Sequence, residues 1–285
     1  FKPVVDFLAL SKPQRSSTEE APVFSFPLQA GSVTFNVQTL VYADGSFEIT
    51  LTDVTQAEKN RLLKQQMSHN ITHELRTPVS SISGYLETLL SCPNLSEEQR
   101  TRFLQKAHAQ TLRLTDLIRD VALISKTEEA PELMPVEEID IRQVVDEAAE
   151  EFSNPLEEAG IRFCSELPEL TIRGNYTLVH AIFRNLLENA VRYAGHGVEV
   201  HVVCYSVTSE FAYFSFYDTG CGVEESHLPR LFERFYRVDR GRTRADGGTG
   251  LGLSIVRNAV AFHRGTISVR NRKEGGLEFL FSLHV

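Results

Sequence analysis

Two stretches of this chain carry a helical seam, in which mostly apolar residues recur at steps of three or four. The first seam consists of Ile71, Leu75, Val79, Ile82, Leu86 and Leu89. The second consists of Phe103, Ala107, Gln110, Leu114, Leu117, Val121 and Ile124. Cys92-Pro93-Asn94 breaks the pattern between them, and Ser96 is a suitable N-cap for the second helix. The sequence therefore predicts a hairpin of two long helices within residues 56–127.

The predicted hairpin has apolar faces that are too wide for its two helices to cover for each other. Pairing two hairpins into a four-helix bundle would bury both faces. We therefore expect this chain to form a homodimer through residues 56–127.

Length and composition limit the classes of protein to which the chain can belong. Its 285 residues suffice for about two domains, and a formal charge of −9 argues against nucleic-acid binding. The four cysteines (Cys92, Cys164, Cys204 and Cys221) lack metal-site spacing, and we expect them to stay reduced in the cytoplasm. No apolar run approaches the length of a membrane span. Because the sequence begins at Phe1, we expect a piece of a longer protein, whose anchor in the inner membrane, if present, lies outside it.

Residues 23–54 alternate apolar and polar side chains and predict three antiparallel strands, with Ala43-Asp44-Gly45 as a hairpin turn. The segment that follows the last of these strands, Leu51-Thr52-Asp53-Val54-Thr55, resembles the exit of a PAS sensor domain. Residues 1–55 would then be the end of a partial PAS-like domain. An unrelated β-hairpin segment is the alternative.

Residues 128–135 are acidic, contain two prolines and predict a linker to a second domain at 136–285. Helices are predicted at residues 141–159, 176–193 and 251–263. Strands are predicted at residues 136–141, 161–164, 170–173, 198–207, 210–217, 266–271 and 277–283. This order predicts an α/β sandwich, a mixed sheet with helices on one face, and makes the whole chain α+β.

His73 is the candidate reactive residue of the hairpin. A helix turning about 100° per residue places it roughly 200° from the neighbouring seam residues, so the imidazole points away from the seam. Thr77 shares this outward face, Glu74 is adjacent, and Pro78 is placed to bend or loosen the backbone. An exposed histidine is usually only a surface residue, and His69, one turn earlier on the same face, is the rival.

Three polar residues of the helix predicted at 176–193 share one face. Asn185 and Asn189 lie four residues apart, and Arg192 follows one turn later. Amide oxygens can coordinate Mg²⁺, and arginine meets phosphate oxygens, so this face suits a metal–phosphate ligand. Solvated helix residues are the alternative interpretation.

Two glycine-containing segments flank a basic stretch. Asp218-Thr219-Gly220-Cys221-Gly222 follows a strand, where a carboxylate can accept a hydrogen bond from an exocyclic amine; a plain turn explains the pentad equally well. The run Gly-Gly-Thr-Gly-Leu-Gly-Leu at 247–253 precedes a helix and offers N–H groups to an anion. Between them, residues 231–237 with Arg240, Arg242 and Arg244 are suited to fold over a triphosphate as a lid.

Together these motifs resemble those of sensor histidine kinases. The string His-Glu-Leu-Arg-Thr-Pro at 73–78 resembles the phosphoacceptor box, and His69 lacks such a string. The segments at 185–190, 218–222, 232–236 and 247–253 resemble the four nucleotide-binding boxes, in the family's order. The resemblance covers about residues 56–285. Thr72, Val79 and Arg192 replace the common Ser, Leu and Lys, and Arg and Lys do not meet phosphate with identical geometry.

The resemblance implies a protein-histidine kinase that autophosphorylates His73 from Mg-ATP and passes the phosphoryl group to an aspartate of a response-regulator receiver domain. Glu74 would activate the imidazole, and Thr77 would orient water in a phosphatase reaction on the regulator. Mg²⁺ would be held by Asn189 with Glu188 and Asn185. ATP would be bound by Asn185, Asn189, Arg192, Tyr193, Asp218, Gly220, Gly222, Arg237, Gly248, Gly250, Leu251 and Gly252.

Two other classes remain open at this point. A catalytically inactive nucleotide-binding dimer would signal without phosphorylation, although the boxes have lost none of their asparagine, aspartate or glycine residues. An ATPase of the related chaperone and DNA-repair group would share the nucleotide fold but not the string at 73–78.

Overall fold

The computed structural model describes residues 5–6, 23–42, 44, 46–238 and 248–285. The chain divides between Asn70 and Ile71 into two compact units, which are described separately. Within the described residues, no helix is both long enough and apolar enough to span a membrane.

The first unit contains a three-stranded antiparallel sheet in the order β1-β2-β3. Its strands are β1 (Val23–Ala30), β2 (Val33–Val41) and β3 (Phe47–Asp53), and helix α2 (Thr55–Ser91) follows directly. The prediction of three antiparallel strands is confirmed. Ala43 and Gly45 of the expected turn lie outside the described residues, and the PAS-like character of residues 1–55 stays a prediction.

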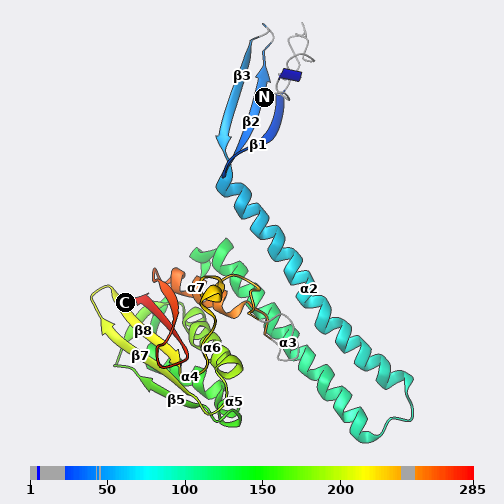
Figure 1. The fold of residues 1–285 in the computed structure, drawn as a ribbon, viewed down its shortest axis with the longest axis vertical. Helices are drawn as coiled ribbons and strands as arrows, with labels where there is room; N and C mark the ends of the chain where they lie inside the picture. The colour runs from blue at the N-terminus through cyan, green and yellow to red at the C-terminus, as the bar shows by residue number, and fades with distance from the viewer. Residues whose placement is uncertain (1–4, 7–22, 43, 45, 239–247) are drawn as a thin grey trace. The chain divides into compact units, whose positions relative to one another are not determined.

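In the second unit, the part of α2 after Ile71 and helix α3 (Glu97–Glu129) form the predicted antiparallel hairpin (Figure 1). The Tyr85 and Phe103 rings lie 6.0 Å apart across it. Ser96 caps α3, with its side chain accepting from the Gln99 N–H while the Gln99 side chain accepts from the Ser96 N–H. Apolar side chains remain exposed on both helices of the single chain, at Val79, Leu86, Leu104, Leu112 and Ile118.

Helix α3 is longer than the sequence analysis assumed. It runs to Glu129, two residues into the stretch expected as a linker, and the Ala130 N–H still donates to the Lys126 carbonyl oxygen. Pro131, which has no N–H to donate, then begins a short 3₁₀ turn at Pro131–Leu133. The irregular connection is therefore shorter than 128–135.

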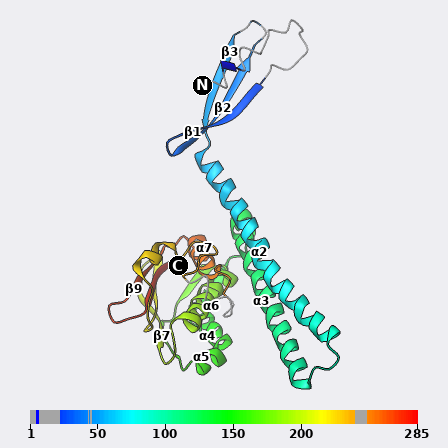
Figure 2. The same ribbon diagram turned by 45° about the vertical axis from the view of Figure 1, so that its right-hand side comes forward.

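The rest of the second unit is an α/β sandwich. A five-stranded mixed sheet has the order β5-β7-β8-β10-β9, in which β5 is parallel to β7 and the other neighbours are antiparallel. Helices α4, α6 and α7 cover one face of this sheet (Figure 2). The bounds are β4 (Glu137–Asp140), α4 (Ile141–Glu151), α5 (Ser153–Glu158), β5 (Arg162–Glu166), β6 (Thr171–Gly174), α6 (Tyr176–Tyr193), β7 (Glu199–Val207), β8 (Phe211–Asp218), α7 (Gly252–Phe262), β9 (Ile267–Asn271) and β10 (Leu277–His284). The predicted fold class is confirmed.

The single helix predicted at 141–159 is wrong in one respect, because the chain forms two helices that meet at Phe152. Phe152 has φ −103° and ψ 9°, outside the helical range. Pro155 cannot donate to a preceding carbonyl group, so it is tolerated in the first turn of α5 but not inside a longer helix.

Candidate functional site

A cavity of about 610 Å³ lies between helices α3 and α6, the segment that follows β8 and the segment that leads into α7. This volume falls within the usual range for small-molecule sites. The cavity brings together most of the residues that the sequence analysis selected in the second domain. These are Asn185, Glu188, Asn189, Arg192, Tyr193, Gly222, Arg237, Gly248, Gly250 and Gly252.

Helix α6 supplies the polar wall of the cavity. The Asn175 side chain caps the helix by accepting from the Leu178 N–H at 3.0 Å, and the opposite face packs into the core through residues such as Phe183, which is fully buried. The Asn185 amide nitrogen donates to the Ala181 carbonyl oxygen at 2.7 Å, which leaves its amide oxygen for the cavity side. Arg192, which is expected to bind phosphate, pairs at 2.7 Å with Glu188, which is expected to bind Mg²⁺.

The glycine run packs directly against this wall, which explains why side chains are excluded there. A Cβ atom at position 252 would lie 2.7 Å from the Asn185 amide oxygen, and one at position 248 would lie 2.8 Å from the Tyr193 hydroxyl oxygen. Gly250 has φ +72°, a conformation that glycine adopts without steric cost. The segments at 185–193 and 248–252, far apart in sequence, therefore form one site.

Asp218 lies at the end of β8 and is buried. One carboxylate oxygen accepts from the Gly220 N–H at 2.8 Å, and the other accepts from the Leu277 N–H at 3.4 Å. Burial raises the pKa of this carboxyl group, and the two backbone donors oppose that rise. Each oxygen retains a lone pair for a further donor, as recognition of an amine requires.

The phosphoacceptor candidate lies on α2, which runs uninterrupted through Pro78. His73 is exposed, as its position relative to the seam predicts, and Thr77 is exposed on the same side. The Thr77 hydroxyl donates to the His73 carbonyl oxygen at 3.3 Å. Glu74 is partly buried and pairs with Arg113 of α3 at 3.5 Å.

Several selected residues do not line the cavity, as far as the described part of the chain shows. Asp218, Gly220 and Leu251 are not lining residues, although close neighbours in sequence are, and His73, Glu74 and Thr77 lie on α2. Arg240, Arg242, Arg244 and Gly247 lie outside the described residues.

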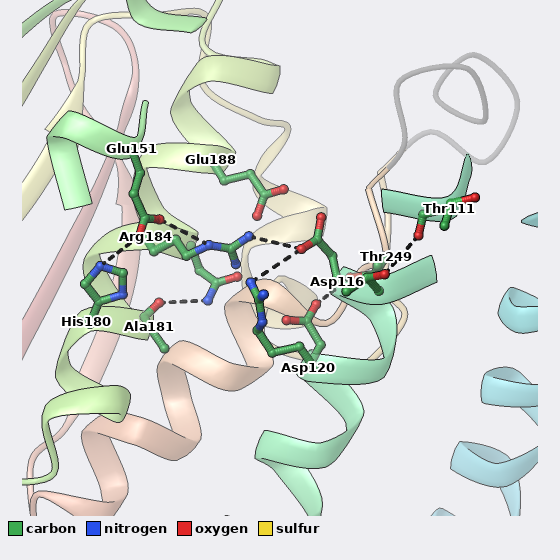
Figure 3. Close-up of polar contacts among 12 residues, drawn as sticks. Thr111, Asp116, Asp120, Glu151, His180, Ala181, Arg184, Glu188 and Thr249 are labelled. Carbon is green, nitrogen blue, oxygen red and sulfur yellow. Dashed lines mark hydrogen bonds and ion pairs between the residues drawn. The ribbon is translucent and has the colours of Figure 1, made fainter. Parts of the chain in front are cut away.

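The contribution of α3 to the cavity was not predicted from the sequence. Arg113, Asp116 and Asp120 line the cavity from this helix, and Figure 3 shows the two aspartates pointing toward Arg184 and Thr249. Asp116 pairs with Arg184 at 3.7 Å, and Asp120 accepts from the Thr249 hydroxyl at 3.3 Å. The spacing of three and four residues, which places all three on one polar face, was the available signal.

Asp120 is the most perturbed acid of this contact. It is 8% exposed, and burial, opposed by the charge of Arg184, raises its pKa to about 6. The contact between α3 and the glycine loop therefore includes a carboxyl group whose pKa burial raises to about 6.

Comparisons with known families divide the chain into two matched regions. Residues 63–130 match the His Kinase A (phospho-acceptor) domain. Residues 174–285 match the family described as histidine kinase-, DNA gyrase B- and HSP90-like ATPase. The cavity therefore draws residues from both matched regions, since α3 lies in the first and α6 and the glycine run lie in the second.

Curated relatives cover most of this chain. The phosphate regulon sensor protein PhoR of Pseudomonas aeruginosa is 32% identical over 245 residues, covering 84% of this chain and 54% of the relative. The sensor-like histidine kinase SenX3 of Mycolicibacterium smegmatis is 31% identical over 255 residues, covering 88% of this chain and 66% of the relative. The chain therefore spans between about half and two thirds of the length of these relatives.

A solved structure agrees with the fold over nearly the whole chain. It is that of the histidine kinase ThkA in complex with the response regulator protein TrrA, with a TM-score of 0.61 and 21% identity. It covers 93% of this chain and 79% of the solved chain. At this identity the likeness concerns the fold alone.

Proposed function

This chain belongs to the sensor histidine kinases of two-component systems, and we propose that it transfers the terminal phosphoryl group of ATP to His73. The observation that carries this proposal is the pairing of two features in one chain. An exposed histidine opens the string His-Glu-Leu-Arg-Thr-Pro on α2, and a cavity downstream is walled by glycines and by an Asn-Asn-Arg face.

The cavity residues fit a nucleotide. The glycine run leaves no room for side chains beside Asn185 and Tyr193, which is the arrangement that lets backbone N–H groups approach phosphates. Asp218 would accept from the adenine amine, with Gly220 and Gly222 next to the ring. Arg192, Tyr193, Arg237, Gly248, Gly250, Leu251 and Gly252 would hold the phosphates.

Asn185 and Asn189, with the carboxylate of Glu188, form a donor set of oxygen atoms that suits Mg²⁺. When bound, the ion would neutralise negative charge on the phosphates. For Glu188 to act as a ligand, its pairing with Arg192 has to open, which would free the arginine for a phosphate oxygen.

In the transfer step a ring nitrogen of His73 forms a bond to the terminal phosphorus, and the bond from that phosphorus to the bridging oxygen breaks. The leaving group is ADP, and the imidazole N–H proton passes to Glu74. Little covalent chemistry is required of the protein, so positioning and charge stabilisation supply most of the catalysis.

We further propose that phosphorylated His73 passes its phosphoryl group to an aspartate of a response-regulator receiver domain. ThkA, which has a similar fold, was solved with a response regulator. Thr77, exposed one turn after His73, would orient water in the reverse dephosphorylation of that regulator.

The working unit is proposed to be a homodimer, because α2 and α3 expose apolar side chains that a second hairpin would cover. Its proposed parts are residues 1–55, a PAS-like segment; 56–127, the dimerisation hairpin; 128–135, a linker whose first two residues continue helix α3; and 136–285, the ATP-binding domain. Residues 1–285 are proposed to work in the cytoplasm, where ATP is supplied. Any inner-membrane anchor would lie in segments outside this sequence.

The test is labelling of the purified chain with [γ-³²P]ATP and Mg²⁺. We expect an acid-labile label that His73→Gln removes, while ATP binding stays within about twofold. The matched variant His69→Gln should keep the label. Full labelling of His73→Gln would contradict the proposal. ATP binding without any label in the unaltered chain would instead favour the catalytically inactive signalling dimer.

A further inference from the structure

Arg113 contacts both the residue next to the proposed phosphoacceptor and the proposed nucleotide cavity. It lies on α3 with a side chain that is only 16% exposed, and it pairs with Glu74, the residue next to His73, at 3.5 Å. The same side chain lines the nucleotide cavity together with Asn189, Arg192 and other cavity residues.

The charges around Arg113 indicate an anionic ligand. Burial lowers the pKa of its guanidinium group, Glu74 opposes this effect, and the nearby positive charges of Arg237 and Arg192 add to it. Three guanidinium groups thus converge on one region of the cavity, although like charges repel one another. A polyanion there would relieve this repulsion and would receive several charge-assisted hydrogen bonds.

Helix α3 is also the wall that faces the glycine run, because Asp120 contacts the Thr249 hydroxyl. Arg113 lies seven residues earlier, which is about two helical turns along the same face. A nucleotide whose phosphates lie along the glycine run would therefore direct its terminal end toward α3.

We propose that Arg113 is a positioning residue shared between Glu74 and the terminal phosphate of ATP. In the state described, the guanidinium group holds Glu74. With ATP bound, it donates to oxygens of the terminal phosphate, which frees the Glu74 carboxylate to take the proton of His73. Occupation of the cavity by a triphosphate is in this way coupled to activation of the phosphoacceptor. This inference rests on the proposed function of the same site.

The experiment compares the dissociation constants of ATP and ADP, each with Mg²⁺, for the unaltered chain, Arg113→Gln and Arg119→Gln. ADP lacks the terminal phosphate, so a purely structural role of Arg113 would change both affinities equally. We expect Arg113→Gln to weaken ATP binding about tenfold or more and ADP binding less than twofold. Arg119, on the same helix with a side chain that is 65% exposed, is the matched control and should change neither.

Equal changes in ATP and ADP affinity, or none, in Arg113→Gln would overturn the inference while leaving the proposed function in place. Failure of the unaltered chain to bind ATP would overturn both. If Arg113→Gln does not fold, Arg113→Lys decides. Lysine keeps the charge but loses the planar fork of donors, so a selective loss of ATP affinity of about two- to tenfold supports the inference, and an unchanged ATP-to-ADP ratio overturns it.

Discussion

Helix α2 around His73 and helix α6 beside the cavity are both amphipathic, yet they bury very different numbers of residues. Pro78 is the buried residue of α2, whereas α6 buries nine of its eighteen residues against the sheet and α7. The nucleotide wall is therefore fixed by the packing of a single chain. The proposed phosphoacceptor lies on a helix whose apolar side chains stay exposed in the single chain, so the two regions should respond differently to small changes.

The largest effect is expected at Gly252, where the glycine run packs against Asn185 of α6. In Gly252→Ala the new Cβ atom would lie 2.7 Å from the amide oxygen of Asn185. Asn185 is buried and anchored to the Ala181 carbonyl oxygen, so it cannot move away easily. Overpacking of this kind costs about 1–3 kcal/mol, and we expect ATP affinity by calorimetry to fall about tenfold or more. Unchanged affinity would contradict a tight cavity wall.

The second-largest effect is expected at Asp218, whose two carboxylate oxygens each accept a hydrogen bond from a backbone N–H. In Asp218→Asn an amide NH₂ group would face one of these donors. We expect a loss of about 1–3 kcal/mol in the free energy of unfolding and weaker ATP binding. Urea unfolding and calorimetry measure the two. Asp146→Asn, on the exposed side of α4, is the control and should change the unfolding free energy by less than about 0.5 kcal/mol.

A smaller, pH-dependent effect is expected at Asp120. Burial raises its pKa from 3.8 to about 6, so the folded state binds a proton more tightly than the unfolded state does. The unfolding free energy should therefore fall by about 1–3 kcal/mol as the pH rises from about 4 to above 6. In Asp120→Asn this contribution is absent. Urea titrations of both proteins should give a difference that grows across this pH window; a constant difference would contradict the assignment.

The smallest effect is expected on α2. At Gly84 an added Cβ atom would meet nothing within 4 Å, and alanine favours a helix over glycine by up to about 1 kcal/mol. Gly84→Ala should therefore raise the melting temperature slightly and leave phosphorylation within about twofold. A large loss of phosphorylation would mean that this face of α2 is covered by a partner in the working dimer, which would sharpen the contrast with α6.

Much of the fold could be predicted because the local signals agreed. The helix at 176–193 matched its prediction residue for residue, since Asn175 caps its start and Gly195, with φ +108°, follows its end. The sheet and the hairpin likewise followed from period and turn chemistry. The break at Phe152 was missed because the apolar pattern continues across it, while the decisive residue, Pro155, lies three positions later.

The site could be predicted only in part, for a physical reason. For motif residues such as Asn185 and Gly252, the residue type and the spacing indicate the kind of ligand that they could bind. The types of Arg113, Asp116 and Asp120 do not indicate a role in the site, because charged residues are common on solvated helix faces. Their role depends on the packing of α3 against the glycine loop, a contact across 129 residues of sequence between Asp120 and Thr249. Their spacing indicates a shared polar face of α3, but it does not indicate which segment packs against that face.

The nucleotide cavity is proposed to serve the exposed imidazole of α2. The most direct test is to incubate the unaltered chain with Mg-ATP and to map the phosphorylated residue by mass spectrometry under neutral or alkaline conditions, where phosphohistidine persists. We expect a phosphoryl group on His73. A phosphoryl group on His69 or on any other residue, with His73 unmodified, would contradict the proposal.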